Sequence, residues 1–422
     1  RGGRLLKSVI VKNLLGLRNW IDARFPLMQL WNEHVGQYYA PKNFNFWYYF
    51  GVLALVVLVI QILTGIWLVM SYKPDANFAF ASVEYMMRDV EWGWLIRYMH
   101  STGASFFFIV IYLHMFRGIM YGSYQKPREL LWILGMCLYL ALMAEAFFGY
   151  LLPWGQMSYW GAQVIISLFG AIPFVGETLS LWIRGDYVVS DITLNRFFAF
   201  HVIALPFAIA GLVVLHILAL HHVGSNNPDG IDIKANKNAQ GNPVDGIPFH
   251  PYYTTKDAPA VVALLILMAV VIFFAPEMGG YFLEHNNFVP ADPLKTPEHI
   301  APVWYFTPFY SILRANTINF FMVPAKLWGV IFMGLGTMVF FLLPWLDKGK
   351  VRSIRYRGWI YKTALGLFVV SFLILGYLGL LPPTPARTAL AQVCTVIYFL
   401  FFLLMPFYTK WDKTKPVPER VT

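Results

Sequence analysis

The sequence has few charged residues and only two cysteines. Charged side chains make up 13% of the 422 residues, whereas a soluble globular domain usually carries about 25%. Cys137 and Cys394 both lie in apolar runs, and neither belongs to a Cys-x-x-Cys motif. This argues against a disulfide framework, a covalently attached c-type haem and an iron–sulfur cluster. The shortage of charge indicates instead a chain that runs largely through a membrane.

Long apolar runs explain why 58% of the residues are hydrophobic. A run of about 20 apolar residues is long enough to cross a bilayer as a helix. Eight such runs are separated mostly by short clusters of glycine, proline, asparagine and charge, and they predict eight transmembrane helices, at 47–71, 94–121, 130–151, 192–222, 259–279, 326–346, 359–381 and 388–408. The two longest connections, 152–191 and 280–325, contain weaker apolar segments such as 157–170, which we expect to form helices at the membrane surface.

The net charge of +10 is concentrated in one set of connections. Basic residues gather at 1–24, 126–128, 234–256, 348–357 and 410–420, and they are sparse in the alternate connections. Because cytoplasmic loops are the basic ones, both termini are predicted to face the cytoplasm and both long connections to lie outside. The charge is thereby explained without a nucleic-acid partner. An amphipathic stretch within residues 1–40 is expected to lie on the inner membrane surface.

Two of the predicted helices each carry a pair of histidines. His100 and His114 are 14 residues apart on the second span, and His201 and His216 are 15 apart on the fourth. Each pair is separated by roughly 21–23 Å along its helix, and its members point to similar faces. A single histidine in a membrane helix can simply bond a neighbouring helix, but ionisable side chains there are usually functional. Both helices run from outside to inside, which predicts two levels with two imidazole ligands each: His100 with His201, and His114 with His216.

Two glycine pairs favour haem over another metal at these levels. Gly51 and Gly65 on the first span are 14 residues apart, and so are Gly135 and Gly149 on the third. Small residues at such a spacing also occur where helices pack tightly. Because their spacing matches the histidine interval, we interpret these glycines as leaving space for the faces of two haems.

Two arginines flank the histidines of the second span. Arg97 lies three residues before His100, and Arg117 lies three residues after His114. Either guanidinium could bind a haem propionate, although Arg117 also fits the basic inner face. We therefore predict an all-α membrane protein with four regions: an N-terminal cytoplasmic-face segment (1–46), a di-haem four-helix bundle (47–222), a cytoplasmic connecting loop (223–258) and four further spans with an outer loop (259–422).

A set of longer motifs is specific rather than generic. They are Arg97-Tyr-Met-His100, His114-Met-Phe-Arg117-Gly118, Gly149-Tyr-Leu-Leu-Pro-Trp-Gly-Gln-Met-Ser-Tyr-Trp-Gly161, Asn195-Arg-Phe-Phe, Gly224-Ser-Asn-Asn-Pro228, Pro248-Phe-His-Pro-Tyr-Tyr253, Lys256-Asp257 and Pro302-Val-Trp-Tyr305. In these motifs, and over nearly its whole length, the sequence resembles cytochrome b of the ubiquinol:cytochrome c oxidoreductase (cytochrome bc1) family. The unsplit chain, the 15-residue histidine interval and Val303 most resemble proteobacterial members.

The resemblance implies a function. His100 and His201 would hold a low-potential haem b near the outer face, and His114 and His216 a high-potential haem b near the inner face. Ubiquinol would be oxidised at an outer site, with one electron passing through a Rieske iron–sulfur protein to a membrane-anchored c-type cytochrome (cytochrome c1). The other electron would cross to an inner site and reduce quinone, which couples the reaction to proton translocation. The resemblance also implies a homodimeric complex in contact with lipid, in a bacterial inner membrane.

For the outer site, the resemblance selects four residues of the external loops: Gly161, Pro302, Trp304 and Tyr305. Tryptophan and tyrosine at this depth also serve commonly as interfacial anchors. The family motif has a glutamate where this chain has Val303, and a valine cannot accept a proton. We hypothesise that Glu277, at the outer end of the fifth span, replaces it. The alternative is that Glu277 is a solvated acid at a helix end.

For the inner site, the resemblance selects His221, Ser225, Lys256 and Asp257. An imidazole and a carboxylate can together protonate a quinone. Because His221 and His222 are adjacent at a helix end, an ordinary surface role is the alternative. The 15-residue interval between His201 and His216 leaves the direction of one ligand in question.

Three other classes of protein fit the sequence less well. A transporter would carry inverted repeats and midplane charges, and we find neither clearly. A di-haem anchor subunit of a quinone-linked dehydrogenase is usually smaller and need not carry the long outer loops. A purely structural membrane subunit would leave the histidine and glycine pairs unexplained.

Overall fold

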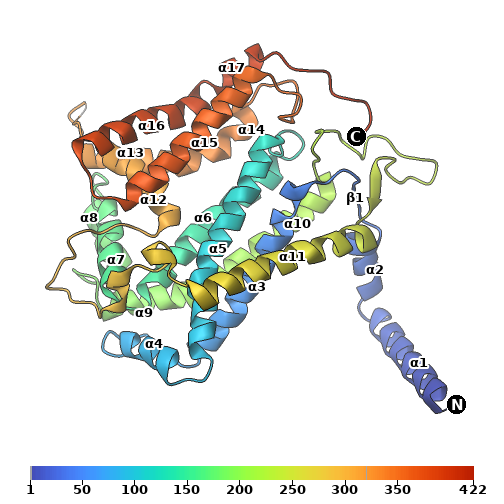
Figure 1. Cartoon of the computed structure of the whole chain (residues 1–422), viewed down its shortest axis with the longest axis horizontal. Helices are drawn as coiled ribbons and strands as arrows, with labels where there is room; N and C mark the ends of the chain where they lie inside the picture. The colour runs from blue at the N-terminus through green and yellow to red at the C-terminus, as the bar shows by residue number, and fades with distance from the viewer. Residues whose placement is uncertain (1, 320) are drawn as a thin grey trace.

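The computed structural model describes residues 2–319 and 321–422, and the chain is almost entirely helical (Figure 1). Within the described residues, eight helical segments are long and apolar enough to cross a membrane. They are Phe46–Val69, Gly93–Met120, Glu129–Leu151, Asp191–Val223, Phe249–Phe274, Ala325–Leu346, Trp359–Leu380 and Pro385–Leu403. The predicted all-α fold with eight spans is confirmed.

Three of the spans combine more than one element. The first joins the 3-10 turn Phe46–Tyr48 to α3 (Phe50–Val69), the fourth joins α9 (Asp191–Ala199), the π-helical η3 (Phe200–Ala204) and α10 (Leu205–Val223), and the sixth joins α13 (Ala325–Met338), η7 (Val339–Leu342) and α14 (Leu343–Leu346). The remaining spans are α5 (Gly93–Met120), α6 (Glu129–Leu151), α11 (Phe249–Phe274), α15 (Trp359–Leu380) and α16 (Pro385–Leu403), the last followed by α17 (Met405–Trp411). The backbone of α11 is kinked at His250, near its start.

The proline cluster that separates the last two spans in the sequence also sets the start of a helix. Pro385 lies in the first turn of α16, where its missing N–H removes no intrahelical bond. The hydroxyl of Thr384 accepts a hydrogen bond from the backbone N–H of Arg387 and caps that turn. The helix therefore begins at Pro385, three residues before the predicted start at 388, although both effects are local.

The fifth span differs from its prediction. We placed its start at residue 259, but α11 begins at Phe249 and continues through Pro259. Hydropathy detects only the part of a helix that lies in lipid, and this helix extends beyond that part into the polar segment. As a result, Lys256 and Asp257 lie on α11 rather than in a loop.

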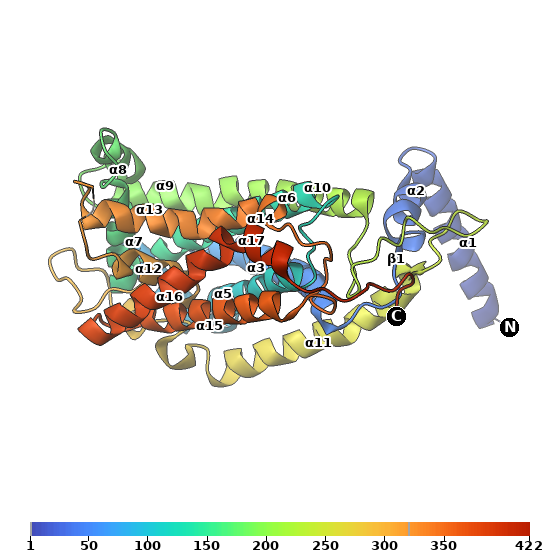
Figure 2. The ribbon, with the colours of Figure 1, turned by 90° about the horizontal axis from the view of Figure 1, so that it is seen from above.

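The surface helices of the long connections gather at one end of the molecule. They are α7 (Gln156–Phe169) and α8 (Gly176–Arg184) in the first connection and α12 (Thr307–Ala315) in the second. Figure 2 shows these helices at the left and both chain termini at the right. A further short helix, α4 (Ala79–Arg88), follows the first span at the same end as α7 (Figure 1). The termini and the long connections therefore lie on opposite sides.

The N-terminal segment extends away from the body of the molecule (Figures 1 and 2). It consists of α1 (Gly2–Asp22), α2 (Leu27–Trp31) and the π-helical η1 (Asn32–Gly36). The short strand β1 (Tyr39–Pro41) then pairs antiparallel with β2 (Gly246–Pro248), just before α11. Several apolar side chains of α1 are exposed, namely Val9, Ile10, Val11, Leu14, Leu15, Leu17 and Trp20. The expectation that this segment rests on a lipid surface stays a prediction.

The C-terminal tail is tied to the connection between α10 and α11. The carboxylate of Asp245 lies 3.0 Å from Lys42 and 2.8 Å from Arg420. Hydrogen bonds from Arg420, and then from Lys42, hold the pKa of Asp245 at about 2 despite its burial. The backbone N–H of Thr422 donates to Asp229 at 3.0 Å. These contacts fix the polar side on which the inner site lies.

A buried ion pair joins the sixth and seventh spans. Arg357 Nη2 lies 2.6 Å from Asp347 Oδ2, with side-chain exposures of 1% and 0%. The hydroxyl of Tyr124 and the amide of Gln125 also donate to Asp347, each at 2.7 Å. The carboxylate therefore connects the α5–α6 turn with the start of α15.

Asp347→Asn is expected to lower the stability of the protein, because it leaves the guanidinium of Arg357 buried without a counter-charge. Breaking a buried ion pair from one side costs about 3–5 kcal/mol. The unfolding midpoint of the purified complex should fall, and an exposed match, Asp89→Asn, should leave it nearly unchanged. Equal midpoints for the two variants would contradict this role of the pair.

Candidate functional site

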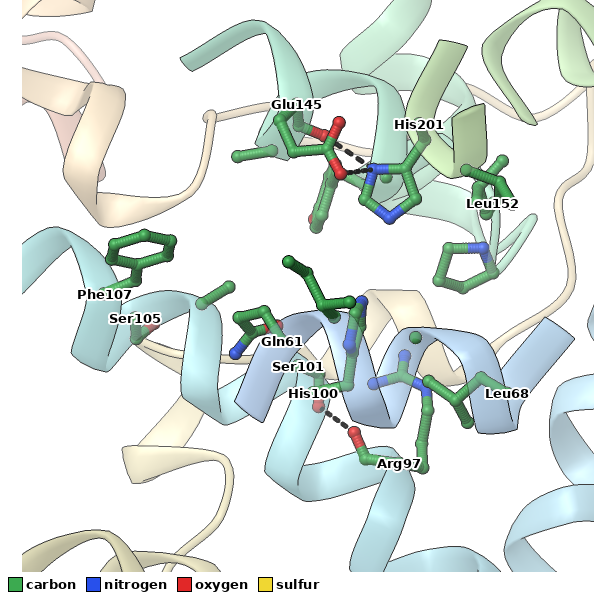
Figure 3. A pocket seen from close by; sticks show the side chains of 18 of the residues that line it. Gln61, Leu68, Arg97, His100, Ser101, Ser105, Phe107, Glu145, Leu152 and His201 are labelled. Atoms are coloured by element: carbon green, nitrogen blue, oxygen red, sulfur yellow. Dashed lines mark hydrogen bonds and ion pairs between the residues drawn. The ribbon is translucent and has the colours of Figure 1, made fainter. Parts of the chain in front are cut away.

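The four histidines of the second and fourth spans face each other in two pairs. The ring centres of His100 and His201 are 6.1 Å apart, with their planes at 89°. Those of His114 and His216 are 6.5 Å apart, with their planes at 63°. Figure 3 shows His100 and His201 on opposite walls of a cavity. The structure thus brings together the pairs that the helix directions predicted.

A π-helical turn accommodates the longer histidine interval. The segment η3 (Phe200–Ala204) includes His201. A π turn is closed by a bond between residues five apart instead of four, so it holds one residue more than an α turn. That turn absorbs the fifteenth residue of the interval, and His201 and His216 both face α5. The departure from 14 residues therefore does not displace a ligand.

Each histidine ring packs against one of the predicted glycines. A Cβ atom added to Gly51, Gly65, Gly135 or Gly149 would lie 3.4, 3.2, 3.2 or 2.3 Å from the Cε1 atom of His114, His100, His216 or His201, respectively. The sequence predicted that these glycines leave space for the faces of two haems. In the structure, their immediate effect is to leave room for the four rings, so that α3 can approach α5 and α6 can approach the fourth span.

Hydrogen bonds at Nδ1 orient three of the rings. The hydroxyl of Thr64 lies 3.0 Å from His100 Nδ1. His201 Nδ1 lies 2.9 Å from the carbonyl oxygen of Glu145 and 3.1 Å from its carboxylate. Arg117 Nη2 lies 3.3 Å from His114 Nδ1. Thr64 and Glu145 can accept the Nδ1–H of His100 and His201, which leaves Nε2 of each ring for a metal. Arg117 can only donate, so its contact orients His114 without fixing that tautomer.

Both levels fit a haem iron. A ligating imidazole nitrogen lies about 2.0–2.1 Å from its metal, so two opposed rings have centres roughly 6 Å apart. Within residues 2–319 and 321–422, no group of three or more His, Cys, Asp or Glu side chains could hold a metal ion. The protein therefore offers two ligands per level, and a macrocycle that supplies the others completes the coordination.

The cavity between His100 and His201 extends to the outer loops. Its volume is about 350 Å³, and its lining is mostly apolar. Gly65, Gly149 and the predicted propionate partner Arg97 line it near the histidines. Tyr150, Phe282, Leu283, Asn287, Val303 and Tyr305 line its outer part. The candidate redox site and the candidate quinol site are thus parts of one cavity.

The Pro302-Val-Trp-Tyr305 motif forms one wall of the outer part. Val303 and Tyr305 are 3% and 4% exposed and line the cavity. The Tyr305 ring stacks on Phe108 at 3.9 Å, and its carbonyl accepts a hydrogen bond from Tyr112. The indole N–H of Trp304 donates to Ser105 at 3.0 Å. The motif is therefore held rigidly against α5.

The other predicted outer segment, which contains Gly161, lies beside Tyr150, a residue that lines the same cavity as Val303 and Tyr305. A Cβ added to Gly161 would lie 3.7 Å from the Tyr150 ring, its nearest neighbour. The side chain of Gln156 donates to the carbonyl of Lys295 and accepts from the backbone of Asp292, both at 2.8 Å. These bonds dock the second long connection on α7. Two loops that are distant in the sequence thus share one cavity.

Glu277 lies away from the wall that the Pro302-Val-Trp-Tyr305 motif forms. Its carboxylate is 3.5 Å from Nδ1 of His285, and its side chain is 33% exposed. Neither Glu277 nor Glu284 lines the cavity directly, but the carboxyl of Glu284 accepts a hydrogen bond at 2.6 Å from Tyr150, which does. The sequence did not single out Glu284.

The inner residues gather around Tyr38. Its ring stacks on His221 at 4.3 Å, and its hydroxyl lies 3.0 Å from Ser225 Oγ. Burial raises the pKa of Tyr38, which keeps its proton in place. His34 Nδ1 lies 3.0 Å from His221 Nδ1, and Lys234 Nζ donates to the carbonyl of His221 at 2.9 Å. Tyr38, His34 and Lys234 were not selected from the sequence.

The other two predicted inner residues lie on α11. The Lys256 ammonium is 5.4 Å from the centre of the Tyr253 ring. Asp257 follows on the same helix, and the Tyr253 hydroxyl donates to the carbonyl of Pro41 at 2.5 Å. Because β1 and β2 hold the N-terminal segment beside α11, both parts of the predicted site lie at one end of the bundle.

The fold and these sites define a class of protein. Its first four spans carry two facing histidine pairs at two levels, a cavity joins the outer level to the loops, and a polar cluster lies at the other end. This is the architecture of a multi-pass membrane protein built for electron transfer across a bilayer.

Comparison with known proteins gives the family. Residues 35–224 match the family described as cytochrome b/b6/petB, and residues 290–399 match cytochrome b(C-terminal)/b6/petD. The chain belongs to the cytochrome b family. Membership implies haem as its cofactor.

Similar proteins cover nearly the whole chain. Cytochrome b of Allochromatium vinosum is 64% identical over 96% of this chain and 98% of its own length. Cytochrome b of Rickettsia prowazekii is 49% identical over 98% of this chain and 99% of its own. A solved structure described as a hyperthermophilic respiratory Complex III has a chain with a TM-score of 0.85 and 38% identity, which covers 93% of this chain and 98% of that one.

Proposed function

We propose that the chain oxidises ubiquinol in the outer cavity and returns electrons to quinone at the inner cluster, in a cycle that moves protons across the membrane. As a bacterial cytochrome b, it is the catalytic membrane subunit of respiratory complex III, the quinol–cytochrome c reductase. The observation that carries the proposal is the placement of two facing histidine pairs at two levels, between a cavity at one end and a polar cluster at the other.

The histidine pairs are the residues proposed to hold the irons of two haem b groups. Bound haem supplies a one-electron redox centre at each level, of low potential at the outer and high potential at the inner. His100 and His201 hold the outer group, and His114 and His216 the inner one. Arg97 and Arg117 are the candidate partners of the propionates, because each is a cation beside one of the two levels.

The outer cavity is proposed to bind the quinol head group. Val303 and Tyr305 give it an apolar wall, and Gly161 leaves space beside Tyr150. Pro302 and Trp304 hold that wall in place, the latter through Ser105. Protons released here leave on the side of α7 and α8.

The inner cluster is proposed to protonate the reduced quinone. His221 is the proposed proton donor to the quinone. Its contact with His34 allows a second imidazole to replace the proton that His221 gives up. Ser225 and Tyr38 can bind a quinone oxygen, and Lys256 and Asp257 connect the cluster to the polar side. Protons taken up here come from the side of the two termini.

The remaining assignments concern partners and location. A Rieske iron–sulfur protein and cytochrome c1 are proposed to take one electron from each quinol. The relative from Bradyrhizobium diazoefficiens named cytochrome b/c1, which is 46% identical, supports the second partner. The apolar faces of the spans are proposed to contact lipid and a second copy of the complex. The distribution of basic residues supports an inner membrane location with both termini cytoplasmic.

His221→Leu tests the inner site. Loss of a general acid typically slows a reaction by about 10²–10⁴-fold, and we expect that reduction in the rate at which quinone reoxidises reduced cytochrome b in the purified complex. The exposed neighbour His222 gives the matched control, His222→Leu, which should reoxidise at the wild-type rate. A wild-type rate in His221→Leu would contradict the assignment of the inner site. A wild-type complex that fails to reduce cytochrome c with ubiquinol would overturn the whole proposal.

A further inference from the structure

The outer cavity lacks the carboxylate that the family motif provides. Val303 occupies that position, is 3% exposed and lines the cavity. Oxidation of a quinol releases protons, and a buried hydroxyl needs an acceptor within hydrogen-bond reach or one proton relay away. The proton must therefore pass to water or to a group in another part of the chain.

A tyrosine–glutamate pair lies at this cavity. Tyr150, at the outer end of α6, lines the cavity, and its hydroxyl donates to Glu284 Oε2 at 2.6 Å. Glu284 directly precedes the 3-10 turn η5 (His285–Phe288). Its chain neighbours Phe282 and Leu283 also line the cavity. The carboxyl is thus one hydroxyl away from the space where a quinol would bind.

The environment of Glu284 suits a proton acceptor. Burial raises the pKa of Glu284 to about 7, and the hydrogen bond from Tyr150 lowers it only in part. The carboxylate and the acid are therefore both available near neutral pH, where a general base works best. Glu277, by contrast, is one-third exposed and is paired with His285.

The titratable groups that face Glu284 come from three elements. Tyr150 comes from α6, Tyr305 from η6 (Trp304–Phe306), and the pair of His285 and Glu277 belongs to the same loop. Burial, and then the charge of Glu284, raise the pKa of Tyr305, so its phenol keeps its proton. Of these groups, Tyr150 is the one that hydrogen-bonds to the carboxylate of Glu284.

We propose that Glu284 is the proton acceptor of the outer site and that it acts through the hydroxyl of Tyr150. This rests on the proposed oxidation of quinol in this cavity. The quinol O–H bond breaks and its proton binds the Tyr150 oxygen, while the tyrosine's own proton moves to Glu284. The products are a quinol anion and a neutral Glu284 carboxylic acid, with Tyr150 unchanged. The anion then gives its electron to the iron–sulfur partner.

Glu284→Gln tests this role. Glutamine keeps the size of the side chain and can accept the bond from Tyr150, but it cannot take up a proton. We expect quinol oxidation at pH 7 to fall by about 10²–10⁴-fold. In the wild type, the rate should rise with pH as Glu284 loses its proton near pH 7, and in the variant that rise should disappear. Two intact b-type absorbance components would show that the variant is folded.

Two further variants make the test specific. Glu298→Gln removes an exposed carboxylate of the same loop and should keep the wild-type rate and pH profile. Val303→Glu, added to Glu284→Gln, restores a carboxylate at the cavity wall and should recover most of the lost rate. Recovery supports a missing proton acceptor, whereas a folded double variant without recovery would assign Glu284 a structural role and overturn the proposal.

Other results would also overturn it. One is a Glu284→Gln complex with the wild-type rate and pH profile. Another is a Glu277→Gln complex that loses quinol oxidation while Glu284→Gln does not, which would return the role to the residue expected from the sequence. If the wild-type complex did not oxidise quinol, the proposed function would fail instead, and the two failures are therefore distinct.

Discussion

His201→Ala is expected to remove one of two b-type absorbance components and to stop quinol-driven reduction of cytochrome c. The reason is that His201 is one of the two histidines proposed as ligands at the outer level, where its ring centre lies 6.1 Å from that of His100. A dithionite-reduced minus oxidised spectrum of the purified complex, titrated against potential, separates the components. His100→Ala should lose the same component as His201→Ala.

The inner pair provides the reciprocal experiment. His114→Ala and His216→Ala should remove the other component and leave the outer one in place. His222→Ala changes an exposed histidine at the end of the same span and should retain both components. A wild-type complex with a single component, or variants that lose components without regard to level, would contradict the proposed arrangement of ligands.

The fold was largely predictable because hydropathy and charge act locally. Lipid requires long apolar helices, and loop charge sets their direction, so the spans and the side of each loop follow from the sequence. The start of α11 at Phe249 could not be predicted in this way, since its first turns lie in polar surroundings where hydropathy carries no information. The strand pairing of Tyr39–Pro41 with Gly246–Pro248 is a long-range contact and was also missed.

The histidine pairs were predictable for a different reason. Two ligands on one helix must obey its period, so their spacing reveals their common face. The π turn at Phe200–Ala204 accommodates the extra residue between His201 and His216. No comparable pattern in the sequence predicts such a turn. Glu145 could have been found, because an acidic residue within an apolar span usually has a function. In the structure it contacts the ring of His201.

Contacts between distant segments set the limit of sequence reasoning. Tyr150 and Glu284 are 134 residues apart, and His34 and His221 are 187 apart. No periodicity connects such pairs, because a helical repeat relates residues within one element and these partners lie on different elements. The resemblance predicted residues for both quinone sites, but it could not indicate which carboxyl would replace the one absent at Val303. That choice depends on the docking of the second long connection on α7 through Gln156.

Gly149→Ala is expected to have nearly the effect of His201→Ala. The added Cβ would lie 2.3 Å from Cε1, 2.7 Å from Nδ1 and 2.9 Å from Nε2 of His201, closer than real Cβ contacts. The ring cannot easily move aside, because its Nδ1 is held by Glu145. The outer component should therefore be lost or strongly shifted in potential, and the inner component should stay. The redox titration used for the histidine variants measures both.

Gly51→Ala is the matched comparison for this prediction. Its Cβ would lie 3.4 Å from Cε1 of His114, at the near edge of ordinary van der Waals contact, so the inner component should change little. Gly65 and Gly135, each at 3.2 Å, should give intermediate shifts, in the outer and the inner component respectively. A graded, level-specific series would show that each glycine makes room for one ligand ring. Equal effects at all four positions would mean that the glycines serve helix packing in general, and the spacing that they share with the histidines would then need another cause.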